Sequence, residues 1–355
     1  MKVFLECFCL LCLCACHSSR KAEIVLKDYY IYEHYQPVVY RESKYLLANL
    51  ADEIKSDYRL DNGDWHFSID LRDRAGEFFY LQDMIVFLQP DTKLEIECNQ
   101  RNRHESIFKG ELEKEAYWLN QSMLRGANTI NPCTSRDLLS WSKYCEDVNR
   151  MADSLQEKVR TISKSRKYIQ ESRERLDLIR VVAYCMYVDR VLNTQKFNGN
   201  FESEEAFSEW KKQQMTEIEP QIVEKVSEVL KKYSGNDILR NVHGQRALIS
   251  VENLQKGVLE SFHFDQFREL MDYRNKLEDP NFEYSAEMVE YAKHLQDTCL
   301  RRHLQQTVTR NQDLVEGTVM NDFEFEDVDG KKHRLSDYNG MTIYLDIWAT
   351  WCNPC

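Results

Sequence analysis

Glycine and proline are scarce in this sequence, at 11 and 6 of 355 residues. So low a content excludes a collagen-like repeat, a low-complexity linker and a sandwich dense in tight turns. No apolar run approaches the roughly 20 residues that a membrane-spanning helix needs. Positive charge is also in deficit, since 47 Lys and Arg stand against 59 Asp and Glu, a formal net charge of -12. That balance argues against a nucleic-acid partner, which would call for a basic surface.

Cysteine is sparse in the body of the chain, although the sequence holds 12. Seven lie near the two ends, and the body holds only Cys98, Cys133, Cys145, Cys185 and Cys299. An odd, scattered set does not suggest a disulfide framework, and none of the five has the paired spacing of a zinc site. We therefore expect five buried thiols, no metal and no cofactor.

Aromatic residues are plentiful, with 19 Tyr, 16 Phe and 6 Trp, which excludes general disorder. The length suits two or three domains, each with its own core. The pattern along the chain predicts an α+β multi-domain protein: a signal over 1–16, a β-rich domain over 22–110, a helical region over 111–315 and a further α/β domain that begins at 316.

The N-terminus has the form of an export signal. Met1 and Lys2 precede an apolar stretch, Val3 to Ala15, that is too short to span a bilayer. Leu13-Cys14-Ala15-Cys16 resembles the lipobox of bacterial lipoproteins. The resemblance implies cleavage behind Ala15 and acylation of Cys16, and several acyl chains would anchor the protein stably to a membrane. An ordinary cleaved signal is the alternative, and either one takes the chain out of the cytoplasm.

Residues 22–110 alternate as strands do. Trp65 to Leu71 places every second side chain on one apolar face, and Leu94 to Cys98 alternates again. Between them, Glu77 to Leu88 is apolar enough for one or two more strands. Several short strands at this spacing predict a small β-sandwich or sheet domain, without a catalytic signature.

Residues 111–315 change to a helical period. Apolar side chains recur every three or four residues from Trp141 to Ile162 and again from Ile222 to Tyr233. Thr134 to Asp137 suggests a capped helix start, and Met288 to Cys299 predicts a later helix with both of these residues in the core. We expect roughly six helices that act as a packing module; a groove for a partner is the alternative.

The last segment, 316–355, combines strand and turn signals. Phe323 to Glu326 alternates, Asp329-Gly330 is a hairpin-turn dipeptide, and Leu335 to Gly340 suggests a short turn. Thr342 to Trp348 is a nearly continuous apolar run, which predicts a strand buried on both faces. This strand would lead directly into Trp351-Cys352-Asn353-Pro354-Cys355.

Two cysteines separated by two residues can close a small disulfide ring and reopen it. In dithiol oxidoreductases the first cysteine lies at a helix N-terminus, where the helix dipole favours the thiolate. Its thiolate attacks a substrate disulfide, and the second cysteine resolves the mixed disulfide. Pro354 suits the first turn of such a helix because the missing N–H is not needed there.

A longer run of residues strengthens this interpretation: Gly317, Asp322-Phe323, Asp327, Asp329-Gly330-Lys331, Leu335-Ser336-Asp337, Gly340 and Trp348-Ala349-Thr350-Trp351-Cys352-Asn353-Pro354-Cys355. The run resembles the thioredoxin-like domain of the TlpA/ResA family, which are membrane-anchored, extracytoplasmic thiol–disulfide oxidoreductases. The segments before it resemble, more diffusely, the DUF4369-like domain and helices of Bacteroidetes lipoproteins in that family. Asn321 and Ile347 depart from the family pattern, which usually has Pro and Phe at these places.

The resemblance implies site residues and partners. Cys352 would be the nucleophile and Cys355 the resolving thiol, supported by Trp351 and Pro354. Protein disulfides would be the substrates, with an upstream thiol reductant, and some relatives serve apocytochrome c maturation. The place of action would be the periplasmic side of the cell envelope, with Cys16 in the membrane.

Other interpretations of the cysteine pair are a zinc half-site, an idle pair and a peroxiredoxin site. A thioredoxin fold also needs a helix, further strands and a cis-proline loop after the motif, and the sequence ends at Cys355. We therefore expect an incomplete thioredoxin-like domain, a natural product that continues further, and weak or no activity of this chain by itself. A non-catalytic surface lipoprotein that binds or scaffolds is the alternative function.

Overall fold

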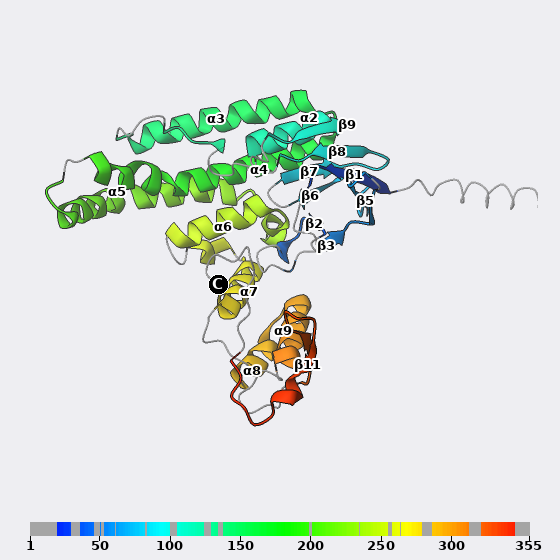
Figure 1. The fold of residues 1–355 in the computed structure, drawn as a ribbon. Coiled ribbons are helices and arrows are strands. Elements are labelled where there is room, and N and C mark those ends of the chain that lie inside the picture. The colour runs from blue at the N-terminus through cyan, green and yellow to red at the C-terminus, as the bar shows by residue number, and fades with distance from the viewer. Residues whose placement is uncertain are drawn as a thin grey trace, which may run out of the picture. The chain divides into compact units, whose positions relative to one another are not determined.

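The computed structural model describes residues 20–29, 36–45, 50, 53–60, 62–81, 84–99, 105–123, 129–133, 138–198, 201–233, 235–254, 258–262, 264–278, 286–311 and 321–344. Contacts divide the chain into two compact units, Met1–Arg274 and Asn275–Cys355 (Figure 1). The boundary lies inside the segment that the sequence predicts to be helical, so the β-rich part and most helices belong to one unit. The mixed helix and strand content agrees with the predicted α+β class.

Nine strands of the first unit form two sheets. They are β1 (Lys21–Lys27), β2 (Val38–Arg41), β3 (Glu53–Lys55), β4 (Tyr58–Arg59), β5 (Trp65–Asp70), β6 (Glu77–Leu81), β7 (Met84–Leu88), β8 (Lys93–Glu97) and β9 (Ile107–Gly110). One sheet has the order β4-β5-β1-β8-β9 and the other the order β3-β2-β6-β7. β1 and β8 pair in parallel, whereas the other recorded strand pairs of this unit are antiparallel.

The two sheets share one apolar core. Phe67 and Ile69 point inward from β5, and Phe79 and Val86 point inward from the other sheet. Leu71 is buried as well and Trp65 is half-buried, which confirms the predicted alternation. Because inner-face side chains of both sheets meet in this way, the predicted β-sandwich is present.

The smaller sheet is buried on its second face too, which explains its continuous apolar sequence. Phe78 and Phe87 point away from the sandwich core and pack on Tyr168 of α4 (Arg166–Cys185), with ring centroids 6.0 and 5.4 Å apart. A strand covered on both faces needs apolar residues at successive positions. β7 accordingly has no exposed residue.

The other described secondary-structure elements of this unit are helical. They are α2 (Glu113–Trp118), η3 (Leu119–Met123), α3 (Trp141–Ile162), α4, η5 (Val188–Leu192), η6 (Asn193–Asn198), α5 (Glu204–Leu230), η7 (Gly235–Arg240), α6 (Val242–Leu254), η8 (Val258–Phe262) and α7 (Asp265–Glu278), which crosses the unit boundary. α4 contacts α3, α5 and α6, and Figure 1 shows these three around it. None of the helices among the described residues could span a membrane by length and apolar character.

The helical period is confirmed where the sequence shows it most clearly. In α3 the residues Trp141, Tyr144 and Val148 are buried. This helix begins at Trp141, and the Ser140 hydroxyl accepts a hydrogen bond from the amide of Lys143 at 3.3 Å. The suggested start at 134–137 lies outside the described residues.

Cys133, Cys145, Cys185 and Cys299 are free thiols. Cys98, Cys145 and Cys185 are buried, as predicted, whereas Cys133 and Cys299 are only half-buried. Burial raises the pKa of the Cys145 thiol to about 12, and it does the same for Cys185. Cys145 and Cys185 are thus apolar packing groups with little thiolate.

The second unit contains α8 (Ala286–His294), α9 (Thr298–Asn311), β10 (Glu324–Glu326), β11 (Lys332–Arg334) and the short 3-10 helix η10 (Leu335–Tyr338). Met288 is buried, as predicted. β10 and β11 pair antiparallel across Gly330, whose φ of 79° suits glycine, so the predicted hairpin turn is confirmed.

The strand predicted from Thr342 to Trp348 is not formed where it is described. Residues 342–344 have no strand structure, and Ile343 and Tyr344 are 48% and 90% exposed. A strand needs a neighbour for its backbone hydrogen bonds, and no described strand pairs with these residues. Residues 345–348 lie outside the described part.

Candidate functional site

The residues that the sequence assigns to the chemistry lie outside the described residues: Cys16, Trp351, Cys352, Pro354 and Cys355. Their positions relative to one another therefore remain predictions. The structure does describe the approach to the motif, from 321 to 344, which includes most of the upstream residues that carry the family resemblance.

Asp322 connects the start of this approach to η10. Its carboxylate accepts hydrogen bonds from the backbone amide of Ser336 at 2.9 Å, from the Ser336 hydroxyl at 3.1 Å and from Nε of Arg334 at 2.9 Å. The Ser336 amide and the Arg334 guanidinium hold the pKa of Asp322 below its usual value. An aspartate at this position thus fixes the chain end that enters β10.

Asp327 closes the hairpin turn in the same manner. It accepts hydrogen bonds from the backbone amides of Asp329 and Lys331 at 3.0 and 2.9 Å, and its second oxygen lies 2.9 Å from Nε2 of His333. The other ring nitrogen of His333 lies 3.2 Å from the Tyr338 hydroxyl. The His333 interaction, followed by these amides, lowers the pKa of Asp327.

Aromatic rings complete this segment. Phe325 stacks on His333 and on Tyr338, with ring centroids 5.7 and 6.0 Å apart. The family-like aspartates and the glycine therefore have local structural roles, and the two motif cysteines lie outside the described residues. His333 and Tyr338 were missed by sequence reasoning, because no local spacing pattern relates them to Asp327.

The first unit contains a buried polar centre that the sequence did not indicate. Arg175 of α4 is 1% exposed and donates through Nη1 to Oε1 of Glu42 at 2.7 Å. The same carboxylate accepts from the Tyr80 hydroxyl at 2.9 Å and from the backbone amide of Val242 at 3.2 Å. The Arg175 guanidinium also lies 4.0 Å from the centroid of the Phe78 ring. One carboxylate thereby joins the sandwich, α4 and α6.

A hollow of about 740 Å³ adjoins this centre and is lined by charged side chains from the strands, α4 and η7. Most of the charges are already paired: Arg41 with Glu77, Lys167 with Asp73, and Arg240 with Asp237. Glu171 has only longer ion-pair contacts, at 3.6 Å to Lys167 and 3.7 Å to Arg175. Burial raises the pKa of Glu171, because desolvation disfavours the charged carboxylate.

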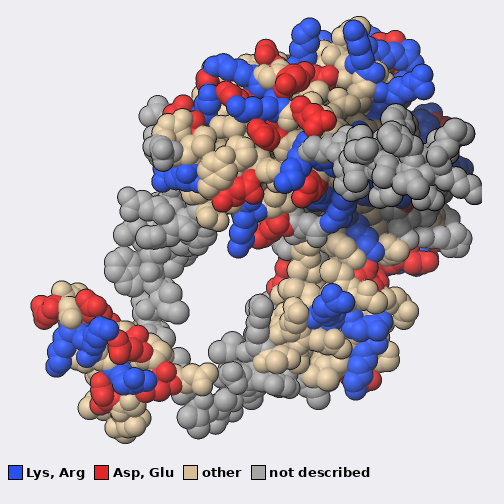
Figure 2. Space-filling model, turned by 90° about the vertical axis from the view of Figure 1, so that its right-hand side faces the viewer, with Lys and Arg blue, Asp and Glu red and all other residues tan. Residues whose placement is uncertain are grey.

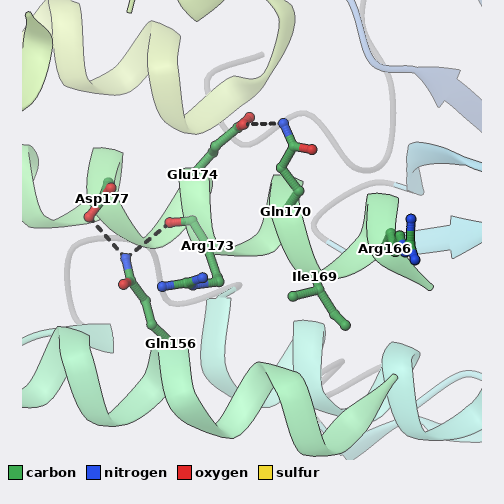
Figure 3. A pocket seen from close by; sticks show the side chains of 7 residues that line it. All are labelled: Gln156, Arg166, Ile169, Gln170, Arg173, Glu174 and Asp177. Atoms are coloured by element: carbon green, nitrogen blue, oxygen red, sulfur yellow. Dashed lines mark hydrogen bonds between the residues drawn. The ribbon is translucent and has the colours of Figure 1, made fainter. Parts of the chain in front are cut away.

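A second hollow, of about 370 Å³, lies between α3 and α4 (Figure 3). Gln156 reaches from α3 and donates to Oδ1 of Asp177 at 2.9 Å and to the carbonyl of Arg173 at 3.3 Å. Gln170 donates to Glu174 at 2.9 Å on the far side of α4. These hydrogen bonds satisfy the side-chain amides of Gln156 and Gln170, whereas the buried Nε of Arg173 has no hydrogen-bond partner among the described residues.

Neither hollow presents a metal site, since no group of three or more His, Cys, Asp or Glu side chains among the described residues could hold an ion. Lys and Arg side chains lie among Asp and Glu side chains over the described surface drawn in Figure 2. That surface therefore offers a mixture of charges.

The chain is similar, over a short stretch, to curated thiol–disulfide oxidoreductases. The ResA protein of Geobacillus thermodenitrificans is 46% identical over 39 residues, which are 11% of this chain and 22% of the relative. The ResA protein of Bacillus subtilis is 43% identical over 42 residues, or 12% and 24% of the two chains. The thioredoxin-like protein YneN of Bacillus subtilis is 37% identical over 54 residues, or 15% and 32%.

The matches thus span between a fifth and a third of the length of these relatives. No family model matches the chain, and no solved structure matches it significantly. The similarity indicates a redox function related to thiol–disulfide exchange and nothing more specific.

Proposed function

We propose that this chain belongs to an extracytoplasmic thiol–disulfide oxidoreductase that reacts through Cys352 and Cys355. The observation that carries the proposal is the Trp-Cys-Asn-Pro-Cys motif together with the similarity to ResA proteins. We assign the match of 39 residues to the segment from Gly317 to Cys355, because that segment has the same length and contains the family-like residues.

The proposed reaction begins with the Cys352 thiolate. Its sulfur forms a bond to one sulfur of a protein disulfide, and the other substrate sulfur leaves as a thiolate that takes up a proton. The Cys355 thiolate then attacks Cys352 Sγ, which releases the second substrate thiol and leaves a Cys352–Cys355 disulfide. The substrate gains two electrons, and a thiol reductant on the same side of the membrane returns the pair to the dithiol. In reverse, the same steps oxidise a substrate dithiol.

The described approach supports this proposal through its geometry. Asp322 ties the start of the segment to η10 and Asp327 closes the hairpin turn, by accepting the backbone amides of Ser336 and Lys331, each at 2.9 Å. Turns of fixed shape limit the directions in which the chain can leave η10 toward the motif. A disulfide-exchanging thiolate requires such positioning, because its rate depends on access to the substrate sulfur.

We further propose that Cys16 is acylated and holds the protein at the periplasmic side of the cell envelope. The lipobox-like Leu13-Cys14-Ala15-Cys16 supports this. Lipid attachment would keep the cysteine pair close to membrane-bound thiol reductants, and several acyl chains on one residue would make that attachment stable.

Trapping of the mixed disulfide tests the catalytic assignment. The Cys355→Ala variant is incubated with a short peptide that contains one intramolecular disulfide, and the adduct is located by peptide mass spectrometry. We expect an adduct on Cys352 that dithiothreitol releases, because the resolving thiol is missing. The Cys352→Ala variant should form none at this position.

The half-buried Cys299 provides a matched control, since Cys299→Ala in the Cys355→Ala background should leave the yield of the Cys352 adduct unchanged. If adducts form on Cys133 or Cys299 but not on Cys352, the proposed nucleophile is wrong.

A binding module is the second candidate function, and the hollow beside Glu171 favours it. Its volume of about 740 Å³ is within the range of small-molecule sites. A ligand that donates hydrogen bonds to Glu171 would meet a carboxylate whose other contacts are longer than hydrogen bonds. Binding that survives both Cys352→Ala and deletion of 317–355, and is lost in Glu171→Gln, would support this function.

A further inference from the structure

The first half of α5 contributes no buried side chain to the protein. The helix runs for 27 residues from Glu204 to Leu230, and its buried residues are Ile218, Ile222, Val226, Val229 and Leu230. The segment from Glu204 to Glu217 therefore contributes none of them, although it is about 21 Å long. Figure 1 shows this end of α5 away from the strands of its unit.

Aromatic side chains are nevertheless concentrated there. The rings of Phe201, Phe207 and Trp210 form a cluster, with centroids 5.2 Å apart for Phe201 with each of the other two and 5.9 Å apart for Phe207 with Trp210. We call these three residues the tip cluster. Phe197 of the neighbouring η6 is 75% exposed.

The tip cluster continues the apolar stripe of the packed half. Phe207 precedes the buried Ile218 by eleven residues, which is close to three helical turns, so both side chains lie on the same face of α5. Ile218 and Ile222 bury this face against the unit, since α5 contacts α4. Toward the N-terminus the side chains of the stripe are only half-buried, namely those of Met215, Trp210 and Phe207.

Two residues of opposite charge flank the tip cluster, and their spacing is close to two helical turns. Glu204 and Lys211 are seven residues apart and so lie on the same side of the stripe, one before and one after Phe207. Lys211 makes no ion pair among the described residues. Glu204 pairs with Lys196, but the two side chains are 77% and 46% exposed, and a pair so exposed contributes little.

We propose that the tip cluster is the contact of a symmetric dimer, in which two copies of α5 pack antiparallel about a twofold axis near Phe207 and Ser208. In an antiparallel pair the same flanks of the two helices face each other. With the axis at this place, Glu204 of one copy lies level with Lys211 of the second copy, and the reverse pair forms by symmetry.

Charge and symmetry favour a second copy over a different partner. One short segment supplies both members of the ion pair and the aromatic anchors, which is the self-complementarity that a twofold interface requires. Trp and other aromatic side chains at the centre of an interface, with charged residues around them, are typical of stable contacts.

A charge swap tests the arrangement. The full chain carrying Cys16→Ala, which prevents lipid addition, is studied by sedimentation velocity with excess reductant so that no disulfide links two copies. We expect a concentration-dependent dimer. Glu204→Lys and Lys211→Glu should each weaken dimerisation roughly 10-fold, because each brings like charges together twice. The double variant should restore it, since the pairs form again with exchanged signs.

Trp210→Ala should weaken the dimer by roughly 30-fold or more, with far-UV circular dichroism confirming that the variant is folded. Lys225→Glu, on the same helix outside the tip cluster, should leave the dimer unchanged. A chain that stays monomeric at about 100 µM, well above typical dissociation constants of specific dimers, overturns the proposal and assigns the patch to a different partner. A dimer that ignores Trp210→Ala, or a double swap that fails to restore it, also overturns it.

Discussion

At the scale of single residues, the buried Arg175 is the most consequential side chain that the structure reveals. Its guanidinium is removed from water, and Glu42, which is 133 residues away along the chain, compensates its charge. Such a pair does not guarantee stability, since two apolar residues of similar volume can serve as well. Removing Glu42, however, leaves this buried charge with only the longer ion-pair contact to Glu171, at 3.7 Å.

We expect Glu42→Gln to lower the free energy of unfolding by about 3–5 kcal/mol, because Arg175 stays buried and positive. Urea denaturation followed by circular dichroism measures the change. Glu228→Gln, which breaks the exposed pair with Lys225, is the control and should change the free energy by less than about 1 kcal/mol. If the two variants lower the free energy of unfolding equally, Arg175 is not a buried charge that depends on Glu42.

His243 predicts a pH dependence of stability. It is 1% exposed, and burial, followed by the positive charges of Arg175 and Arg246, lowers its pKa well below 6.5. Below pH 6.5 the unfolded chain therefore takes up a proton that the folded chain does not, so this group lowers the free energy of unfolding as the pH falls.

In His243→Gln the decline between about pH 6.5 and 5 should be shallower, by about 1.4 kcal/mol per pH unit, because one proton is no longer taken up on unfolding. The free energy of unfolding measured at several pH values gives the slope. An unchanged slope would mean that His243 is protonated in the folded protein.

At the scale of elements, Asn120 explains how the edge of the smaller sheet ends. β7 is the last strand of that sheet. The Asn120 side chain, which is fully buried in η3, accepts from the amide of Ile85 at 3.0 Å and donates to its carbonyl at 2.8 Å. The amide group thus takes the place of a neighbouring strand, and an unpaired edge is avoided.

Asn120→Ala should lower the free energy of unfolding by about 2–4 kcal/mol, since it leaves two buried backbone groups of Ile85 without partners. Hydrogen exchange of the Ile85 amide should become faster in the same variant. The neighbouring, exposed Gln121 is the control, and Gln121→Ala should change neither quantity by a measurable amount. Unaltered exchange at Ile85 would show that water or another group replaces the side chain.

At the scale of the whole molecule, the two ends of the chain carry the proposed lipid anchor and the proposed cysteine pair. The lipobox-like segment predicts a lipid on Cys16, and the cysteine pair at 352 and 355 predicts disulfide exchange. The sandwich and most of the described helices belong to one compact unit, and α8, α9 and the hairpin belong to the other.

We expect the protein expressed in a bacterium with a lipoprotein pathway to partition into the detergent phase of Triton X-114 and to incorporate labelled palmitate. Cys16→Ser should abolish both, because the acyl-glycerol is attached to sulfur. Cys14→Ser, two residues earlier, is the matched control and should leave the label in place. Label that persists in Cys16→Ser would contradict the lipobox assignment.

Several local features could be predicted from the sequence because each depends on the spacing of neighbouring residues. The alternation at Phe67 and Ile69, the helical period from Trp141 to Val148 and the turn at Gly330 are all present in the structure. Side chains alternate along a strand and recur every 3.6 residues along a helix, so a short window is sufficient to recognise them. The chemistry of the Cys352 and Cys355 pair was predicted in the same way and awaits its test.

Only the tertiary structure decided which distant segments meet. The parallel pairing of β1 with β8, the contact of Arg175 with Glu42, and the Asn120 amide on Ile85 join residues that no local pattern relates. The strand predicted from Thr342 to Trp348 shows the same limit, since its apolar sequence does not form a strand at 342–344, where no other strand pairs with it. Local patterns determine the direction of side chains, but burial and pairing depend on the partner that the fold brings to them.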